Sequence, residues 1–244
     1  MSPPDVTILT GTHLVEAVLR HGRAQPSEIA VLRGGSARGL SRIVKLAQSL
    51  GIAVRWLEED AMRELTGQSV EIAAVLAERP EAHAEDVLTD DGAPLFAIAV
   101  EGVEDPHNLG DILRTALAAG VDFAIVDQHA ANMPREMLAR SSAGASECLP
   151  LVFTRDLAGE LATLSAHGVA VCAATCGDGE DLFQADFPAR VAFVVGGEHR
   201  GLSKHVLDRC DRHVTIPTSP AVQSLSAAAS AAVILFEAAR KRMR

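Results

Sequence analysis

Residues 95–120 read LFAIAVEGVEDPHNLGDILRTALAAG and decide the fold class of the longer part of the chain. The first six residues are apolar without a break, which is typical of a strand buried on both faces of a parallel sheet. Asp105-Pro106 is a turn signal, and Asn108 is of a residue type that caps helices, so we predict a helix over residues 108–119. A strand followed at once by a helix is the repeating unit of an α/β fold.

The same alternation continues on both sides of this unit. Towards the C-terminus, apolar strands are predicted at residues 123–126, 149–153, 169–174, 191–195 and 213–216, with helices over 156–167 and 223–242. Towards the N-terminus, shorter strands (VTIL, IAVL, IAVRW and VEIAAVLA) alternate with helical spacing over 14–20 and 43–50. We therefore predict a small α/β layer domain over residues 1–76 and a mostly parallel, doubly covered sheet over residues 95–244.

Residues 77–94 separate the two predicted domains. This segment is rich in Glu, Asp, Ala and Pro and has no apolar periodicity, so it is predicted to be a linker. Its acidic side chains would keep it in solvent and away from a polyanion.

The composition supports a globular protein but argues against a nucleic-acid partner. Hydrophobic residues make up 48% of the 244 residues and charged residues 22%, which is enough apolar material to bury a core. Lys and Arg number 22 against 32 Asp and Glu, a formal net charge of -10. Since phosphate affinity comes largely from Lys and Arg, binding to RNA requires cations gathered on one face. The segment RGGSARGLSRIVK is such a place, with Arg33, Arg38, Arg42 and Lys45.

The sequence lacks the motifs of metal sites, exported proteins, membrane helices and common nucleotide-binding or hydrolase sites. The cysteines form no CxxC pair, and the nine histidines include no HExxH, so reduced thiols and no metal site are expected. The N-terminus lacks the basic and apolar regions of a signal peptide, and no run approaches the ~20 apolar residues of a membrane helix. The expected location is the cytoplasm. The pattern GxGxxG, a Walker loop and GxSxG are also absent.

Three loops that follow predicted strands carry the candidate chemistry, because ligands of parallel sheets bind at the carboxyl ends of strands. The first holds Asn108 and Arg114, the second reads VVGGEHRGLS over residues 194–203, and the third reads IPTSPAVQSLS over residues 216–226. Glycines let the backbone approach a ligand closely, and an Arg near a helix start can hold a phosphate. Taken singly, the first loop is better explained as an ordinary capped helix with a solvated Arg. The second and third loops are equally compatible with a functional site and with an ordinary βα turn or helix cap.

Taken in this order, the three loops resemble the SpoU (TrmH) family of RNA ribose methyltransferases. The second and third family motifs are matched by GGEHRGLS and IPTSPAVQSLS, and SSAGASECLPL over residues 141–151 is similar to a conserved turn and strand of the family. Residues up to 77, beginning GTHLVEAVLRHG, and the segment DPHNLG resemble the branch that methylates guanosine in ribosomal RNA. The first motif is matched by Asn108, Gly110, Arg114, Ala116 and Gly120.

The resemblance implies a fold that periodicity alone does not predict. The C-terminal domain is expected to be a trefoil α/β knot of the SPOUT type, and residues 1–76 are expected to be an L30e/L7Ae-like domain that binds the RNA substrate. Family members work as homodimers whose active sites lie near the interface. The implied reaction is methyl transfer from S-adenosylmethionine to a ribose 2'-hydroxyl of RNA, with 23S rRNA and guanosine favoured over tRNA.

The resemblance also assigns the site residues. Contacts to S-adenosylmethionine are expected from Thr175, Gly196, Gly197, Ile216 and Leu225. The catalytic group is expected to be Arg114, with Asn108, Glu198 and Ser224 around it. A guanidinium is too strongly protonated to act readily as a base, so we expect Arg114 to position the substrate and to stabilise charge.

The sequence departs from the family pattern in the third loop. Ser226 stands where an Asn is usual, and Thr218 and Pro220 replace the usual Met and Gly. A Ser hydroxyl is shorter than a carboxamide and offers fewer donors. Two alternatives therefore stay open, namely a catalytically weak RNA-binding homologue and, from the acidic charge, an α/β enzyme acting on a small phosphorylated ligand.

Overall fold

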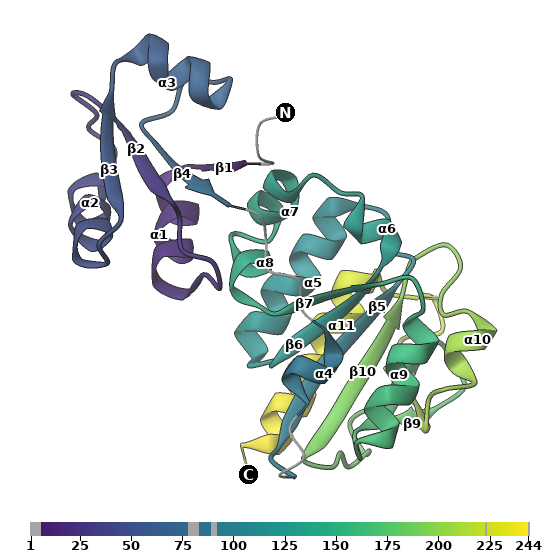
Figure 1. The fold of residues 1–244 in the computed structure, drawn as a ribbon. Coiled ribbons are helices and arrows are strands. Elements are labelled where there is room, and N and C mark those ends of the chain that lie inside the picture. Colours follow the sequence, from purple (N-terminus) through teal and green to yellow (C-terminus); the bar gives the residue numbers. More distant parts are fainter. Residues whose placement is uncertain (1–5, 78–82, 89–91, 223, 244) are drawn as a thin grey trace. The chain divides into compact units, whose positions relative to one another are not determined.

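A computed structural model describes residues 6–77, 83–88, 92–222 and 224–243 (Figure 1). The chain divides into two compact units. The N-terminal unit consists of Met1–Pro80 and Pro134–Cys148, and the C-terminal unit consists of Glu81–Met133 and Leu149–Arg244. Each unit has its own sheet, and the two are described separately below.

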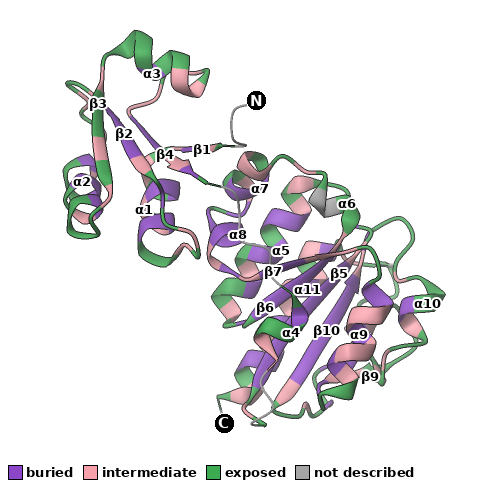
Figure 2. Ribbon diagram, in the orientation of Figure 1, coloured by how far each residue is buried: buried purple, intermediate pink, exposed green. Residues whose placement is uncertain are grey.

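The N-terminal unit contains a four-stranded sheet in the order β1-β4-β2-β3. Strand β4 pairs antiparallel with both β1 and β2, whereas β2 and β3 run parallel. All four strands predicted from the sequence are confirmed, with the bounds β1 Thr7–Thr10, β2 Glu28–Leu32, β3 Ala53–Leu57 and β4 Ile72–Leu76. Figure 2 shows that β2 and β4 are mostly buried, whereas the edge strand β3 is largely exposed.

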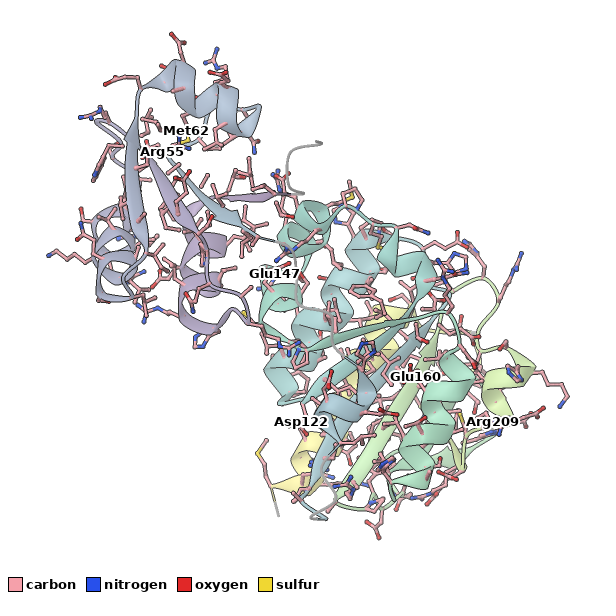
Figure 3. The ribbon with its side chains drawn as sticks, in the orientation of Figure 1. Arg55, Met62, Asp122, Glu147, Glu160 and Arg209 are labelled. Carbon is pink, nitrogen blue, oxygen red and sulfur yellow. The ribbon has the colours of Figure 1, made fainter. Side chains whose placement is uncertain are left out.

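Helices cover both faces of this sheet. Helices α1 (Thr12–His21) and α2 (Leu40–Ser49) bury an apolar stripe on one face, as their predicted spacing requires. Helix α3 (Glu59–Thr66) packs on the other face through Met62 (Figure 3). The sequence did not predict α3, because Met62 is its only buried residue and too few apolar positions remain to show a period.

A segment from the middle of the chain completes the N-terminal unit. Helices α7 (Arg135–Ser141) and α8 (Ala145–Cys148) lie between β6 and β7 in sequence, yet Ala139 belongs to the same core as α1 and α2. The Arg135 guanidinium lies 2.8 Å from the Glu147 carboxylate, whose side chain is 3% exposed (Figure 3). Arg135 also donates to the backbone oxygen of Ala77 at 2.8 Å. Local periodicity does not report which core a helix joins, so the packing of α7 and α8 in this unit could not be read from the sequence.

The C-terminal unit is built on a seven-stranded sheet in the order β7-β6-β5-β10-β8-β11-β9, and every pairing is parallel. The prediction of a parallel sheet is confirmed. The short strand β9 was not predicted, because a two-residue acidic strand carries no apolar pattern. The bounds are β5 Leu95–Glu101, β6 Phe123–Asp127, β7 Leu151–Thr154, β8 Ala170–Thr175, β9 Glu180–Asp181, β10 Arg190–Gly196 and β11 Arg212–Thr215.

Two layers of helices cover this sheet. One face packs against α9 (Leu157–Ala166) and α10 (Lys204–Leu207), and the other carries α5 (Pro106–Ala119) and α11 (Ala227–Arg242), which pack against each other (Figure 1). The single turn α6 (Gln128–Ala131) follows β6. Alternate strand residues such as Phe96 and Ala97 therefore face different helix layers and are both buried.

Part of the predicted linker is structured. Helix α4 (Ala84–Val87) lies within residues 77–94, its Ala84 is 2% exposed, and Val87 and Leu88 pack against the core beneath α9. A four-residue helix is too short for its apolar period to be recognised in sequence. Residues 78–82 and 89–91 of the predicted linker lie outside the described residues.

The helix that follows β5 begins earlier than predicted, and this corrects the role of Asn108. Asp105 is the N-cap, and its carboxylate accepts the N–H of His107 at 2.9 Å, while Pro106 occupies the first helical position, where no N–H is needed. Asn108 is the third residue of α5, so its side chain is not used as a cap. Asp105, which was predicted only to form the turn before the helix, is therefore also the residue that caps it.

Candidate functional site

A cavity of about 460 Å³ opens where β8, β10 and β11 end. It lies at the carboxyl edge of a parallel sheet, where such folds bind ligands, and its size is that of a small-molecule site. Residues from the second and third sequence loops and from α11 line it together: Ala174, Thr175, Cys176, Gly177, Val195, Gly196, Gly197, Glu198, Gly201, Val214, Thr215, Ile216, Pro217, Thr218, Ser224, Leu225, Ala227, Ser230 and Ile234.

All five residues expected to contact the methyl donor line this cavity, namely Thr175, Gly196, Gly197, Ile216 and Leu225. Glu198 and Ser224 also line it, whereas Asn108 and Arg114 do not. Other lining residues were not predicted. Ser230 and Ile234 of α11 occur in an alanine-rich stretch that looks like an ordinary buried helix, and Cys176, an exposed cysteine, directly follows β8.

The structure explains why residues 196 and 197 are both glycine. A Cβ on Gly197 would lie 2.0 Å from the backbone oxygen of Gly102, and one on Gly196 would lie 2.4 Å from the carbonyl carbon of Gly201. The Gly197 N–H donates to the backbone oxygen of Glu101 at 2.7 Å, which holds the loop against the end of β5. Only glycine fits both positions, because backbone from neighbouring segments occupies the space of a side chain.

The cavity walls combine apolar side chains with hydroxyl groups and exposed backbone, and they hold few ionisable groups. Val195, Val214 and Ile234 are buried apolar residues, and the described lining includes no Lys, Arg or His. The ionisable side chains of the lining are those of Glu198 and Cys176. A phosphorylated ligand would find no basic side chain there, whereas a cationic or neutral ligand meets no repulsion.

Asn108 and Glu198 bring the first and second sequence loops together. The Asn108 amide Nδ2 donates to Glu198 Oε1 at 2.7 Å, across 90 residues of sequence. Asn108 lies in the first turn of α5, while Glu198 follows β10 and lines the cavity. The hydrogen bond fixes one carboxylate oxygen of Glu198 at the cavity rim and leaves the other for a ligand.

Arg114 lies away from this cavity. It is six residues beyond Asn108 in α5, which corresponds to about 9 Å along the helix axis and about 120° around it. Its side chain is exposed on the outer face of α5, together with Asp111 and Ala118. Within the ranges that the structure describes, Arg114 makes no ion pair or side-chain hydrogen bond. The chain therefore does not bring Arg114 to its own cavity.

The third loop leads into α11 through two serines with different positions. Ser224 lines the cavity, while the Ser226 hydroxyl accepts the N–H of Ala229 at 3.2 Å and caps α11. Ser and Asn are comparable N-caps, so the departure at Ser226 preserves a capping residue. Helix α11 begins at Ala227 rather than at the predicted residue 223, which itself lies outside the described residues.

The four predicted RNA-binding cations lie in the N-terminal unit and are exposed. Arg33 lies 3.3 Å from Glu58, and Arg42 lies 2.5 Å from Glu16. Arg38 and Lys45 have no ion pair among the described residues. Both existing pairs are at the surface, where such interactions stabilise by about 0–1 kcal/mol, so a phosphate can compete for these arginines.

Cys148, Cys172 and Cys210 lie outside the cavity lining. Burial raises the pKa of the Cys148 and Cys172 thiols to about 11 and that of Cys210 to about 12, so these thiols stay protonated near neutral pH. In the described ranges, no cluster of three or more His, Cys, Asp or Glu residues is placed to hold a metal ion. No helix in those ranges is long and apolar enough to cross a membrane.

Comparison with known proteins identifies both halves of the chain. The SpoU rRNA Methylase family matches residues 95–236, and a domain described as RNA 2'-O ribose methyltransferase substrate binding matches residues 8–82. A curated relative from Shewanella oneidensis, the 23S rRNA (guanosine-2'-O-)-methyltransferase RlmB, is 31% identical over 96% of this chain and 97% of its own. The enzyme of the same name from Ralstonia nicotianae is also 31% identical, over 96% of each chain.

Solved structures share the fold. The SpoU methyltransferase AviRb from Streptomyces viridochromogenes, in complex with the cofactor AdoMet, superposes with a TM-score of 0.80 over 98% of this chain and 91% of its own, at 22% identity. A protein described as RNA 2'-O ribose methyltransferase gives a TM-score of 0.76 over 98% of this chain and 90% of its own, at 23% identity. With the family match over residues 95–236 and relatives that align over nearly the whole length, the chain belongs to the SpoU rRNA methylase family.

Proposed function

We propose that this protein transfers a methyl group from S-adenosylmethionine to the 2'-hydroxyl of a guanosine ribose in 23S rRNA. The observation that carries the proposal is the cavity of about 460 Å³ at the carboxyl ends of β8, β10 and β11, with the Asn108–Glu198 pair at its rim. The curated relatives that align over both units are 23S rRNA guanosine methyltransferases, which favours 23S rRNA over tRNA. This substrate places the enzyme in the cytoplasm.

The residues of the cavity fit S-adenosylmethionine. Gly196 and Gly197 expose backbone at its edge, Ile216 and Leu225 supply apolar contacts, and Thr175 supplies a hydroxyl. The lining has a carboxylate but no basic side chain, which suits a ligand with a positive sulfonium. When bound, this cofactor would supply a methyl group on a sulfonium sulfur, whose carbon an oxygen nucleophile can attack with the neutral thioether as the leaving group. The absence of basic lining residues also weighs against the alternative of a small phosphorylated substrate.

The residues at the rim of the cavity receive the ribose. Asn108 holds one oxygen of Glu198, and the free oxygen accepts a hydrogen bond from the hydroxyl to be methylated. Ser224 adds a hydroxyl on the same rim. Arg114 binds the phosphate next to the target ribose, because its planar guanidinium matches two phosphate oxygens.

A homodimer accounts for the position of Arg114. The outer face of α5 carries Arg114 with Leu117, which is 40% exposed, and the neighbouring α11 exposes Phe236 to 51%. Large apolar side chains at this level of exposure favour contact with another protein surface. A second copy packed on α5 and α11 buries these residues and brings Arg114 next to an active site at the interface. The terminal segment, including α11, is proposed to thread the trefoil knot of the family.

The N-terminal unit serves as the RNA-binding domain. We assign residues 1–76 an L30e/L7Ae-like fold and this role from the family resemblance, residues 77–94 the role of connection, and residues 95–244 the methyl transfer. The exposed Arg33, Arg38, Arg42 and Lys45 supply positive charge for the RNA backbone on a chain that is acidic in total. A catalytically weak homologue remains the second candidate, motivated by Ser226 in the third loop.

Labelled methyl transfer tests the proposal. The full chain is incubated with S-adenosylmethionine carrying a tritiated methyl group and with total RNA from cells that lack the endogenous activity, and the RNA is separated by size. The account predicts label in the 23S rRNA. Label in tRNA would support the tRNA alternative, and binding of RNA without label would support the catalytically weak homologue.

A further inference from the structure

The edge strand of the N-terminal sheet exposes the one tryptophan of the chain. Trp56 lies on β3 with 44% of its surface accessible, although large aromatic residues are usually well covered. Its neighbour Arg55, labelled in Figure 3, marks the position on the strand. Among the described residues, Trp56 has no aromatic or cation–π contact and its indole N–H has no hydrogen-bond partner. The ring is thus available for a ligand.

The register of the sheet places Trp56 at the same end as the basic loop. Trp56 pairs with Val31 and Leu57 pairs with Leu32, so β3 and β2 end together. The chain leaves β2 directly into Arg33, whose backbone N–H donates to the oxygen of Leu57 at 2.8 Å. Parallel strands that end together carry their following loops at one edge. The exposed indole and the cations of residues 33–38 therefore share one edge of the unit.

The indole also lies on the helical side of the sheet. Val54 packs against the core formed with α1 and α2, and side chains two residues apart on a strand point to the same face. Trp56 therefore lies on the face that carries α2, with its exposed Arg42 and Lys45. Figure 2 shows β3 as the exposed edge of this sheet. Residues 33–45 contain four cations and no acidic residue, while Glu58 at the same edge and Glu16 on α1 pair with Arg33 and Arg42. Arg38 and Lys45 have no ion pair among the described residues, so they supply the positive charge on this side that is directly available to a polyanion.

We propose that Trp56 is a stacking platform for an unpaired base of the RNA substrate, with Arg33 and Arg38 binding the phosphates beside that base. Single-stranded RNA is recognised by aromatic rings that stack on bases and by cations that follow the backbone, and duplex RNA offers no splayed base. The surface combines both elements, so it binds a single-stranded segment. The inference rests on the proposed RNA substrate and adds where and how an unpaired part of it is held.

The chain offers a probe for this proposal without any label. Trp56 is the sole tryptophan and tyrosine is absent, so tryptophan fluorescence of the full chain reports on this position alone. The chain is titrated with oligouridylate RNA, with the same strand annealed to oligoadenylate, and with inorganic polyphosphate as a polyanion without bases. We expect saturable quenching by the single strand only. Equal quenching by the duplex or by polyphosphate, or no quenching at all, overturns the proposal.

Variants give an independent measurement. Trp56→Ala is expected to weaken oligouridylate binding on the order of tenfold, and Trp56→Phe, which keeps an aromatic ring, to weaken it less. Leu50→Ala is the matched control, because Leu50 is 46% exposed in the same unit and lies before β3 begins. Trp56→Ala should leave the salt dependence of binding unchanged, whereas Arg38→Ala should reduce the slope by about one.

Failure of this inference differs from failure of the proposed function. If the wild-type chain methylates 23S rRNA but Trp56→Ala binds oligouridylate as the wild type does, the stacking role is wrong and the function stands. If the tryptophan emission changes with protein concentration alone, β3 pairs with a second copy and the RNA role is also wrong. Quenching by the single strand together with the loss in Trp56→Ala supports the proposal even for a catalytically weak homologue.

Discussion

The proposed reaction uses two regions, the cavity that would bind the cofactor and the outer face of α5 that carries Arg114. A single chain forms the whole cavity, but it gives Arg114 no partner among the described residues. The cavity is assembled from β8, β10, β11 and α11, with its glycine loop held by backbone hydrogen bonds. On α5, Arg114 is exposed and has no ion pair among the described residues. The cavity is thus built by the fold of a single chain, while under the proposed function the α5 region is completed only by RNA and a second copy.

This difference has a physical cause. A cavity between strands and a helix is formed by buried apolar contacts, which a folded chain makes by itself. An arginine that binds a phosphate must remain accessible until the phosphate arrives, and its exposed position costs little in the free protein. Variants in the two regions should therefore separate cofactor binding from methyl transfer.

The largest effect is expected for Arg114→Ala. Loss of the guanidinium removes the group that binds phosphate and stabilises charge, so single-turnover methylation should fall by about 10²-fold or more. Cofactor affinity should be unchanged, because Arg114 does not line the cavity. Arg114→Lys should recover little, since an ammonium cannot make the planar two-point contact.

Arg209→Ala is the control, because Arg209 is an exposed arginine of the same unit (Figure 3). Rapid quenching of single turnovers with 23S rRNA measures the rate, and calorimetry measures cofactor affinity. A near-normal rate for Arg114→Ala would place the chemistry in another loop.

Gly197→Ala is expected to weaken cofactor binding, which Arg114→Ala should leave unchanged. The added Cβ would lie 2.0 Å from the Gly102 oxygen and would force the loop away from β5. Overpacking of this kind costs about 1–3 kcal/mol, so cofactor affinity should fall by about fivefold or more if the displaced loop carries that cost into the cavity. Calorimetry is the measurement, and Arg209→Ala, at a residue that lies outside the cavity lining in the same unit, is the control. Wild-type affinity in Gly197→Ala would show that the cofactor binds elsewhere.

A smaller effect is expected at the hydrogen bond that joins the two regions. Asn108→Ala removes the donor that holds Glu198, and the lost bond to a carboxylate should lower the methylation rate by about fivefold, roughly 1 kcal/mol. Asn108→Asp should be worse, because it places two carboxylates together. If Asn108→Asp matches the wild type in steady-state methylation, Glu198 does not act as a carboxylate held by Asn108.

The smallest effect is expected at the cap of α11. Ser226→Asn restores the residue usual in the family and keeps a good cap, so stability should stay within about 0.5 kcal/mol and activity should be equal or higher. Ser226→Ala should lose about 1 kcal/mol of stability, because the N–H of Ala229 loses its acceptor. Denaturant titration measures both. Lower activity of Ser226→Asn would indicate a specific role for the serine hydroxyl.

The strands were predictable from local patterns, because unbroken apolar runs indicate strands of a parallel sheet. The cavity residues Thr175, Gly196, Gly197, Ile216 and Leu225 were predicted only through the resemblance to the family, and all five line one cavity. The packing of α7 and α8 into the N-terminal core was not predictable, since a buried Arg135–Glu147 pair looks like two surface charges in sequence. The position of Arg114 outside the cavity was also missed, because motif spacing does not show which way a helix faces.

The position of the transferred methyl group distinguishes ribose methylation of guanosine in 23S rRNA from methylation of a base or of another RNA. Ribosomal RNA methylated with tritiated S-adenosylmethionine is digested to nucleosides, and the label is separated by chromatography, with Arg114→Ala as the parallel sample. The account predicts label in 2'-O-methylguanosine from 23S rRNA, and little or none with the variant. Label on a base, or on the ribose of a different nucleoside with equal yield from Arg114→Ala, would contradict the account.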